Sequence, residues 1–316
     1  MQAPVSLNVG SIYMRRALFG VAVVGSIALV GTVVSLADSS PASSMPVMKS
    51  SIPRSTVSQK TAARATARAV SPSLATAVFA LTAADGDDAS VAVENLGTGV
   101  VASYNVSDKY VTASIVKLDI LCTLLYQAQL SGRSPSRSAM SLATTMIENS
   151  NNDAAQRLFE DVGGAPAITA ANKVFGLTDT AVEENSVDEA GYSWGDTTTT
   201  VVDQLQLLRQ IFTVSSVLTI SNRSYAKSLM SDVESDQRWG VSAAADDPSS
   251  SGSDYMLKNG WLPRRVTNLW EINSIGEVQH DGQQYLVAVL SNSNKTMDSG
   301  ISVVQQLAKA AVDAST

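Results

Sequence analysis

The sequence predicts an α/β (α+β) protein, in which an antiparallel five-stranded sheet is flanked by helices and carries an inserted all-helical lobe. Three observations support this fold class. β-Prone segments stand near both ends of the domain, segments with helical periodicity fill the middle, and an amphipathic helix closes the chain. Strands from the two ends must therefore pair across the inserted helices to form one sheet.

The first 37 residues predict export. An uncharged apolar run, 17–37, follows Arg15 and Arg16. Its 21 residues are at the border between a cleaved signal peptide, whose apolar core is usually about 7 to 15 residues, and a retained spanning helix of about 20. Residues 1–37 are therefore either a signal peptide or an N-terminal membrane anchor. Small residues at 35–37 favour cleavage before Asp38. Both outcomes predict a secreted or extracytoplasmic domain that meets the membrane only through 17–37.

Residues 38–73 predict a disordered linker. The segment is rich in Ser, Thr, Pro and Ala, carries scattered basic residues and has few large apolar side chains. Such a composition buries too little apolar surface to offset the entropy of ordering the chain. The folded domain is therefore expected to span 74–316.

Periodicity divides this domain into its elements. Short β-prone runs predict strands at 75–81, 90–94, 99–104, 255–261, 266–276 and 284–291. Apolar residues at helical spacing predict helices at 114–129, 138–148, 153–162, 201–212, 224–233 and 300–312. The helix at 114–129 is apolar on nearly every face, which is typical of a buried helix.

Composition excludes several classes of function. His280 is the only histidine and Cys122 the only cysteine, so an intrachain disulfide and a Cys/His zinc cluster are excluded. We expect no metal and no cofactor. Residues 74–316 hold 15 basic against 28 acidic residues. This acidic balance argues against nucleic acid as a partner.

A serine hydrolase with no suitable histidine needs another base, and lysine is a common substitute. The S-x-x-K pattern places both side chains on one helical face, and it occurs at Ser114–Lys117 and again at Ser224–Lys227. Ser114 opens the apolar helix, which would bury Lys117. Ser224 lies in a polar segment, where Lys227 would stay hydrated. We therefore predict Ser114 as the nucleophile.

Two further motifs follow in order, Ser150-Asn-Asn152 and Lys258-Asn-Gly260. The ordered set resembles the penicillin-recognising serine enzymes, which include class A β-lactamases and penicillin-binding proteins. The narrower pattern at 237–240, 257–262 and 273–276 is similar to an actinobacterial subgroup of β-lactamase-related serine hydrolases. The resemblance spans roughly 75–314 and implies the β-lactamase/transpeptidase-like fold.

The resemblance also implies roles. Ser114 would form an acyl-enzyme and Lys117 would help to remove its proton. Ser150 would relay a proton to the leaving nitrogen, with Lys258 keeping the local field positive. The substrate would be bound by Asn152, through its side-chain amide, by Gly260, whose backbone a ligand approaches closely, and by the backbone N–H of Trp261, which completes an oxyanion hole with that of Ser114.

Two departures from the family pattern bear on the reaction. Asn259 replaces the hydroxyl residue that meets the substrate carboxylate, so it is expected at the substrate-binding site with an altered recognition of that carboxylate. Arg238, Arg264 and Arg265 could supply the counter-charge, and each could equally be an exposed surface residue. Of the three, Arg238 is the one assigned to substrate binding. No E-x-x-L-N segment precedes Asp196, and an ungapped count favours Glu183 as the carboxylate that activates the deacylating water. Without such a carboxylate the acyl-enzyme forms but is hydrolysed slowly.

The leading hypothesis is an exported monomeric serine hydrolase that acts on small-molecule β-lactams or on peptidoglycan peptides ending in acyl-D-Ala. A penicillin-binding-protein-like carboxypeptidase or a slowly deacylating penicillin binder is the first alternative. The second is a catalytically idle domain that binds cell-wall material through the same cleft.

Overall fold

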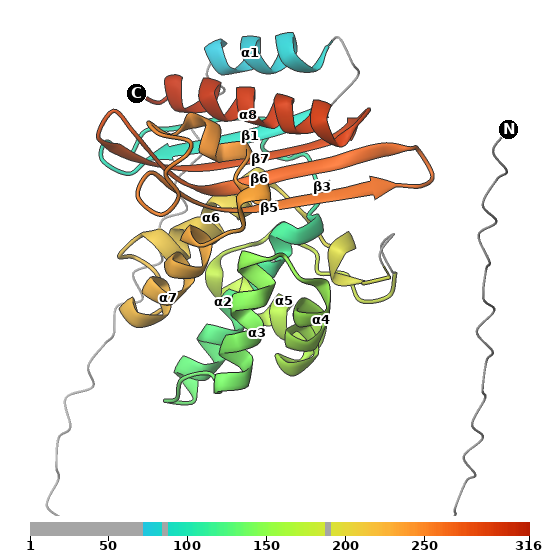
Figure 1. The fold of residues 1–316 in the computed structure, drawn as a ribbon, viewed down its shortest axis with the longest axis vertical. Coiled ribbons are helices and arrows are strands. Elements are labelled where there is room, and N and C mark those ends of the chain that lie inside the picture. Colours follow the sequence, from blue (N-terminus) through green and yellow to red (C-terminus); the bar gives the residue numbers. More distant parts are fainter. Residues whose placement is uncertain (1–71, 84–87, 187–190) are drawn as a thin grey trace, which may run out of the picture. The chain divides into compact units, whose positions relative to one another are not determined.

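The computed structural model describes residues 72–83, 88–186 and 191–316 (Figure 1). The predicted export segment, 1–37, and the predicted linker up to residue 71 lie outside these ranges. Within them, no helix has both the length and the hydropathy needed to cross a membrane. Pro72 and Ser73, the last residues assigned to the linker, are the first residues of a helix.

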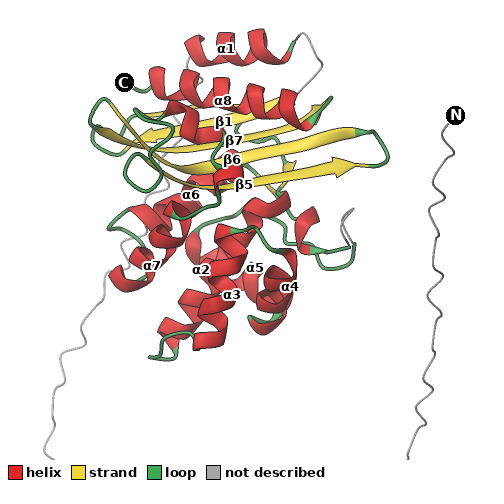
Figure 2. Cartoon of the chain, viewed as in Figure 1, coloured by secondary structure: helices red, strands yellow, loops and turns green. Residues whose placement is uncertain are grey.

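Five antiparallel strands form the main sheet, which confirms the predicted fold class (Figure 2). In chain order they are β1 (Asp88–Asn95), β2 (Val101–Tyr104), β5 (Tyr255–Arg264), β6 (Leu269–His280) and β7 (Gln283–Asn294). Their order across the sheet is β2-β1-β7-β6-β5. Val91 of β1 lies opposite Val289 of β7, so strands from the two ends of the domain meet at the centre. β5 is left as an edge strand.

β7 belongs to two hydrophobic cores at once. Successive side chains on a strand point to opposite faces. Leu286, Ala288 and Leu290 pack against the helical lobe, whereas Val287 and Val289 pack against the C-terminal helix. The sheet is therefore apolar on both faces, which explains the continuous apolar run in this strand.

One face of the sheet is covered by α8 (Met297–Asp313) and α1 (Pro72–Thr82) (Figure 1). The strand predicted at 75–81 is wrong, because this segment is helical. Its alanines favour a helix, and Leu74 and Val78, one helical turn apart, are the residues that it buries. α1 packs on α8, so its apolar stripe follows helical spacing rather than alternation.

The other face carries the helical lobe. It comprises α2 (Val116–Leu130), α3 (Arg137–Glu148), α4 (Asn152–Asp161), α5 (Gly164–Phe175), α6 (Val201–Phe212) and α7 (Ile220–Ser231). The sequence missed α5 because Gly164 and Pro166 resemble a loop. Pro is tolerated in the first turn of a helix, and Gly176 ends this one with φ of 84°.

A two-stranded ribbon joins the lobe to the sheet. It pairs β3 (Tyr110–Val111) with β4 (Thr198–Thr199). The ribbon leads into a single 3₁₀ turn, η1 (Ala113–Ile115), which lies beside β5. This junction sets where the start of α2 meets the edge of the sheet.

Candidate active site

Ser114 lies in η1, immediately before α2. Ala113 has φ of 47°, a left-handed conformation that costs energy in a residue with a Cβ. Such strain persists only where the surrounding structure holds it, and it gathers at functional sites. The N–H of Thr112 donates to the carbonyl of Thr197 (2.7 Å). The chain around Ser114 is thus held by backbone contacts on the side facing the lobe.

Gly260 holds the same turn from the side of the sheet. A Cβ at this position would lie 2.7 Å from the carbonyl oxygen of Thr112 and 2.9 Å from the backbone nitrogens of Ser114 and Ile115. Glycine is therefore required because η1 itself approaches β5. This corrects the expectation that the close neighbour of Gly260 is a ligand.

Lys117 lies one helical turn after Ser114 and is completely buried. Its Nζ donates to Ser114 Oγ (2.8 Å), to the carbonyl of Ser150 (2.5 Å) and to Asn152 Oδ1 (2.7 Å). The ring of Trp194 lies 5.0 Å from the same nitrogen. Lys117 therefore connects the predicted nucleophile with the S-x-N motif.

Ser150 lies between two lysines. Its hydroxyl oxygen accepts from Lys117 Nζ (3.1 Å) and from Lys258 Nζ (2.9 Å). Ser150 has φ of 52°, a second strained position beside the site. Burial lowers the pKa of Lys258 from 10.5 to about 7. With two amine donors on its oxygen, the Ser150 hydroxyl can direct its own proton into the cleft.

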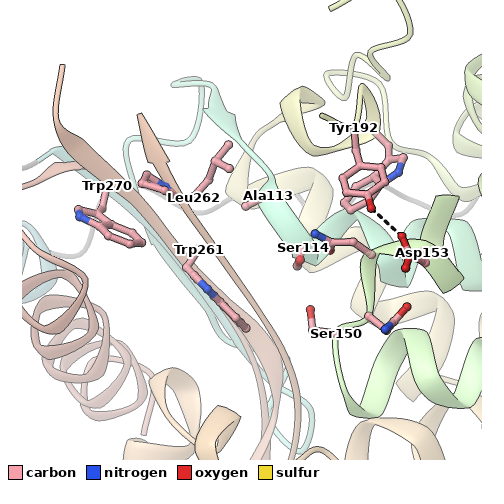
Figure 3. A pocket seen from close by; sticks show the side chains of 12 residues that line it. Ala113, Ser114, Ser150, Asp153, Tyr192, Trp261, Leu262 and Trp270 are labelled. Atoms are coloured by element: carbon pink, nitrogen blue, oxygen red, sulfur yellow. Dashed lines mark hydrogen bonds between the residues drawn. The ribbon is translucent and has the colours of Figure 1, made fainter. Parts of the chain in front are cut away.

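Ser114 and Ser150 border a cavity of about 540 Å³ (Figure 3). It is lined by Ala113, Ser114, Ser150, Asn151, Asn152, Asp153, Tyr192, Trp194, Trp261, Leu262, Pro263 and Trp270. One wall thus comes from the end of β5 and the start of β6, and the other from α4 and the loop before β4. Lys117 and Lys258 reach the two serines from behind this lining.

Two of the predicted substrate contacts line the cavity. The amide of Asn152, at the start of α4, is fixed by Lys117. Trp261 is half-buried and its ring makes an edge contact with that of Trp239, with centroids 6.0 Å apart. Both residues therefore lie within reach of a molecule bound at Ser114.

Asn259 and Arg238 are placed elsewhere. Asn259 is 1% exposed, and its Nδ2 donates to the carbonyls of Gln237 (2.8 Å) and Trp239 (3.0 Å). The Nε of Arg238 donates to the carbonyl of Val233 (3.0 Å). Neither residue belongs to the cavity lining. The prediction that they bind substrate is corrected on this geometry, because the Asn259 amide is already used to secure the loop that precedes β5.

The carboxylate of Glu183 is bound within its own loop. Its Oε1 accepts the backbone N–H groups of Glu184 (3.0 Å), Asn185 (2.6 Å) and Ser186 (3.0 Å). The hydrogen bonds from Asn185 and Ser186, with a smaller one from Glu184, lower the pKa of the Glu183 carboxyl. Glu183 is not part of the cavity lining. The expectation that it activates a water on the acyl-enzyme is therefore corrected, because its carboxylate closes a local turn.

Sequence reasoning missed two aromatic residues of the cavity wall, Tyr192 and Trp194. Tyr192 and Trp194 stack with centroids 5.1 Å apart, and the Tyr192 hydroxyl donates to Asp153 Oδ1 (2.8 Å), as Figure 3 shows. Trp194 Nε1 also donates to Gln156 (3.1 Å). The only available signal was position, since both aromatics stand in the loop just before Asp196.

Arg264, expected as a compensating cation, pairs with Asp196 (2.6 Å). This ion pair joins the end of β5 to the loop that carries Tyr192 and Trp194. Among the described residues, no three His, Cys, Asp or Glu side chains gather in a way that could hold a metal.

Comparison with known proteins connects this geometry to a family. The model of the β-lactamase enzyme family matches residues 130–315, a range that includes Ser150 and Lys258 but begins after Ser114. Among curated proteins, none matches the chain.

Solved structures share the fold. A mutant of PBP-A in an acyl-enzyme complex with penicillin G has a TM-score of 0.64 at 17% identity, covering 77% of this chain and 95% of that chain. A β-lactamase from Chitinophaga pinensis has a TM-score of 0.64 at 16% identity, with 77% and 99% covered. The TLA-1 extended-spectrum β-lactamase has a TM-score of 0.66 at 15% identity, with 77% and 98% covered.

Proposed function

This chain belongs to the β-lactamase enzyme family of serine hydrolases, and from that premise we propose that it attacks β-lactams or acyl-D-Ala peptides through an acyl-enzyme on Ser114. The observation that supports this most directly is the contact between Lys117 Nζ and Ser114 Oγ at 2.8 Å, inside a buried network that ends at a cavity. A base at hydrogen-bond distance is what activation of a serine hydroxyl requires.

In the acylation step the base is the neutral amine of Lys117: it accepts a hydrogen bond from the Ser114 hydroxyl instead of donating one, and it takes that proton as Oγ bonds to the carbonyl carbon. The carbonyl oxygen gains negative charge, which the backbone N–H groups of Ser114 and Trp261 would stabilise. The position of β5 supports this arrangement, because it is the edge strand and η1 lies beside it. Loss of one such donor typically costs about 3 to 4 kcal/mol of barrier.

The C–N bond then breaks, and the leaving nitrogen takes a proton from the Ser150 hydroxyl. Ser150 recovers a proton through Lys117 or Lys258, whose amines both contact its oxygen. Because burial lowers the pKa of Lys258 to about 7, this amine can give and regain a proton near neutral pH. The carbonyl carbon stays bonded to Ser114 Oγ as an ester.

We further propose that the ester is hydrolysed slowly. Among the residues that line the cavity, Asp153 is the only acid, and it accepts the hydroxyl of Tyr192. Glu183 is engaged by three backbone N–H groups. This favours the slowly deacylating penicillin binder or carboxypeptidase-like enzyme over a rapid resistance enzyme.

Intact-mass measurement tests both parts. On incubation with penicillin G, the purified protein should gain the mass of one penicillin and keep it for many minutes, whereas Ser114→Ala should gain nothing. Prompt return to the unmodified mass with steady cephalosporin hydrolysis would contradict slow deacylation. An unmodified wild type that still binds muropeptides, equally well as Ser114→Ala, would favour the idle cell-wall-binding domain.

Glu183→Gln tests whether Glu183 activates the water that hydrolyses the ester or takes no part in deacylation. Because its carboxylate contacts only its own loop among the described residues, we expect unchanged acylation and unchanged decay of the adduct. The decay is followed by mass after removal of free penicillin. A decay at least tenfold slower in the variant would show that Glu183 reaches the ester after all.

Export is part of the proposal, and the apolar run 17–37 after Arg15 and Arg16 supports it. Expression of the full chain with and without 1–37, followed by fractionation, tests it. Recovery of both forms from the cytosol would contradict it.

A further inference from the structure

The cavity beside Ser114 combines one acid with aromatic rings. Of the twelve residues that line it, Asp153 is the only one with an ordinarily charged side chain, and four are Tyr or Trp. Lys117 and Lys258 approach from behind and are fully buried. A bound molecule therefore meets a negative group and aromatic faces at the α4 side of the cavity, with no exposed cation in the lining.

The carboxylate of Asp153 is held in a defined place. Its Oδ1 accepts a hydrogen bond from the Tyr192 hydroxyl at 2.8 Å (Figure 3). Tyr192 in turn stacks on Trp194 with an interplanar angle of 26°. Trp194 is itself fixed by its bond to Gln156. Oδ2 of Asp153 remains to accept a hydrogen bond from a ligand, because Tyr192 is the partner of this side chain among the described residues.

We infer that Asp153 and Tyr192, supported by Trp194, form a subsite for an ammonium group on the acyl side of the substrate. A carboxylate beside an aromatic ring supplies the ionic and the cation–π contacts that recognise an amine. The same aromatic pair already contacts an amine, since Lys117 Nζ lies 5.0 Å from the Trp194 ring.

Position on α4 indicates which part of the substrate reaches this subsite. Asp153 directly follows Asn152, whose amide is the proposed contact for the amide of the substrate side chain. An amine one or two bonds beyond that amide would then lie next to Asp153. This inference rests on the proposed function, and it names the substrate class as acyl donors with a free amine near the scissile acyl group.

A purely structural explanation of Asp153 exists and must be separated from this one. Asp153 stands in the first turn of α4, where an acid stabilises the helix, and its bond to Tyr192 fixes the loop. A structural role would change stability and acylation by all substrates together. A subsite would change the preference between substrates that differ only by the amine.

Penicillin G and ampicillin form such a pair, because ampicillin adds an α-amino group to the benzyl side chain. The measurement is the second-order rate constant of acylation for each compound, by intact mass, and its ampicillin to penicillin G ratio. We expect Asp153→Asn to lower this ratio about two- to fivefold, as loss of one exposed ion pair predicts. Tyr192→Phe, which releases the carboxylate but keeps the ring, should lower it less.

The matched control is Asp161→Asn, which removes the same charge from the other end of α4. Asp161 pairs with Arg157 (3.1 Å) and lies outside the cavity lining. It should leave the ratio unchanged. An equal ratio in wild type and Asp153→Asn, with both penicillins still acylating Ser114, would overturn the subsite while leaving the proposed function intact. Absence of acylation by either compound would overturn both.

Discussion

The same four-residue pattern, S-x-x-K, occurs twice in this chain with different surroundings. Lys117 is completely buried and donates to Ser114 Oγ at 2.8 Å. Lys227 is half-buried, its Nζ lies 5.0 Å from the ring of Phe212, and Ser224 is exposed on the outer surface of α7. Both pairs have the same helical spacing, so the pattern alone does not make a reactive pair.

The difference comes from what lies opposite each helix. η1 and the start of α2 face the edge strand β5 and the turn at Ser150. Asn152 therefore accepts a hydrogen bond from Lys117, and Lys258 donates one to Ser150. Around Lys227, burial lowers the lysine pKa and the charge of Glu277 opposes that shift. The expectation that Lys227 stays hydrated is corrected by its packing on Phe212. The buried hydrogen-bond network around Ser114 and Lys117 is therefore completed by segments that lie far away in the sequence.

The largest effect should come from the two serines. Ser114→Ala removes the attacking oxygen and should lower the acylation rate constant for penicillin G by at least about 10⁴-fold. Ser224→Ala should leave it within twofold. Labelling with a fluorescent penicillin, followed by gel fluorescence, measures both. Equal labelling of the two variants would remove the basis of the comparison.

The two lysines should differ next. Lys117→Met keeps the length of the buried chain but removes the base, and acylation should fall by about 10²- to 10⁴-fold. Lys227→Met should change it little, since Phe212 can pack against methionine equally well. Stopped-flow or quench-flow acylation rates provide the measurement. A comparable loss in Lys227→Met would mean that α7 contributes to the site.

A substitution at Gly260 tests the close packing of η1 against β5, which is found beside Ser114 and Lys117 but not beside Ser224 and Lys227. In Gly260→Ala the new Cβ must push η1 from β5, and a displacement near 1 Å can cost about 100-fold in rate. Gly282→Ala, in the hairpin between β6 and β7, meets no atom within 4 Å but is strained by a φ of 69°, so it controls for a general loss of stability away from the site. Circular dichroism establishes that each variant is folded before its acylation is measured. Full activity in Gly260→Ala would contradict the close approach.

The smallest effect concerns stability and pH. Burial lowers the pKa of Lys258 from 10.5 to about 7, so between these values the unfolded chain binds more protons than the folded one. The free energy of unfolding of the wild type should therefore rise with pH relative to Lys258→Met, by at most about 1.4 kcal/mol per pH unit.

Urea unfolding at pH 7, 8 and 9 measures this difference. Lys227→Met provides the comparison. Burial also lowers the pKa of Lys227, but the charge of Glu277 opposes that shift, so the difference in unfolding free energy between the wild type and Lys227→Met should rise less steeply with pH. Parallel curves for the wild type and Lys258→Met would show that Lys258 keeps an ordinary pKa.

The sequence could predict the parts of the site that depend on local spacing. Ser114 and Lys117 are three residues apart at the start of one helix, and Lys258 stands on a strand whose periodicity was clear. These residues and Ser150 do lie in hydrogen-bonding contact. The catalytic roles of these residues remain predictions.

The parts that failed depend on loops and on contacts across the fold. Glu183 was chosen by counting along a loop, and its carboxylate accepts the backbone N–H groups of the three residues that follow it. Tyr192 and Trp194 carry no periodic signal because they lie in irregular backbone. In the fold, 75–81 was assigned to a strand because an apolar run of seven residues fits either element, and only its packing on α8 decides for a helix.

The division of β7 between two cores has a mechanical consequence. Its odd-numbered side chains pack against α8, and its even-numbered side chains pack against the helical lobe. If either layer separated from the sheet, the β7 side chains on that face would be exposed to water. The lobe that carries Ser114 and the helix pair beyond the sheet are thus coupled into a single melting unit.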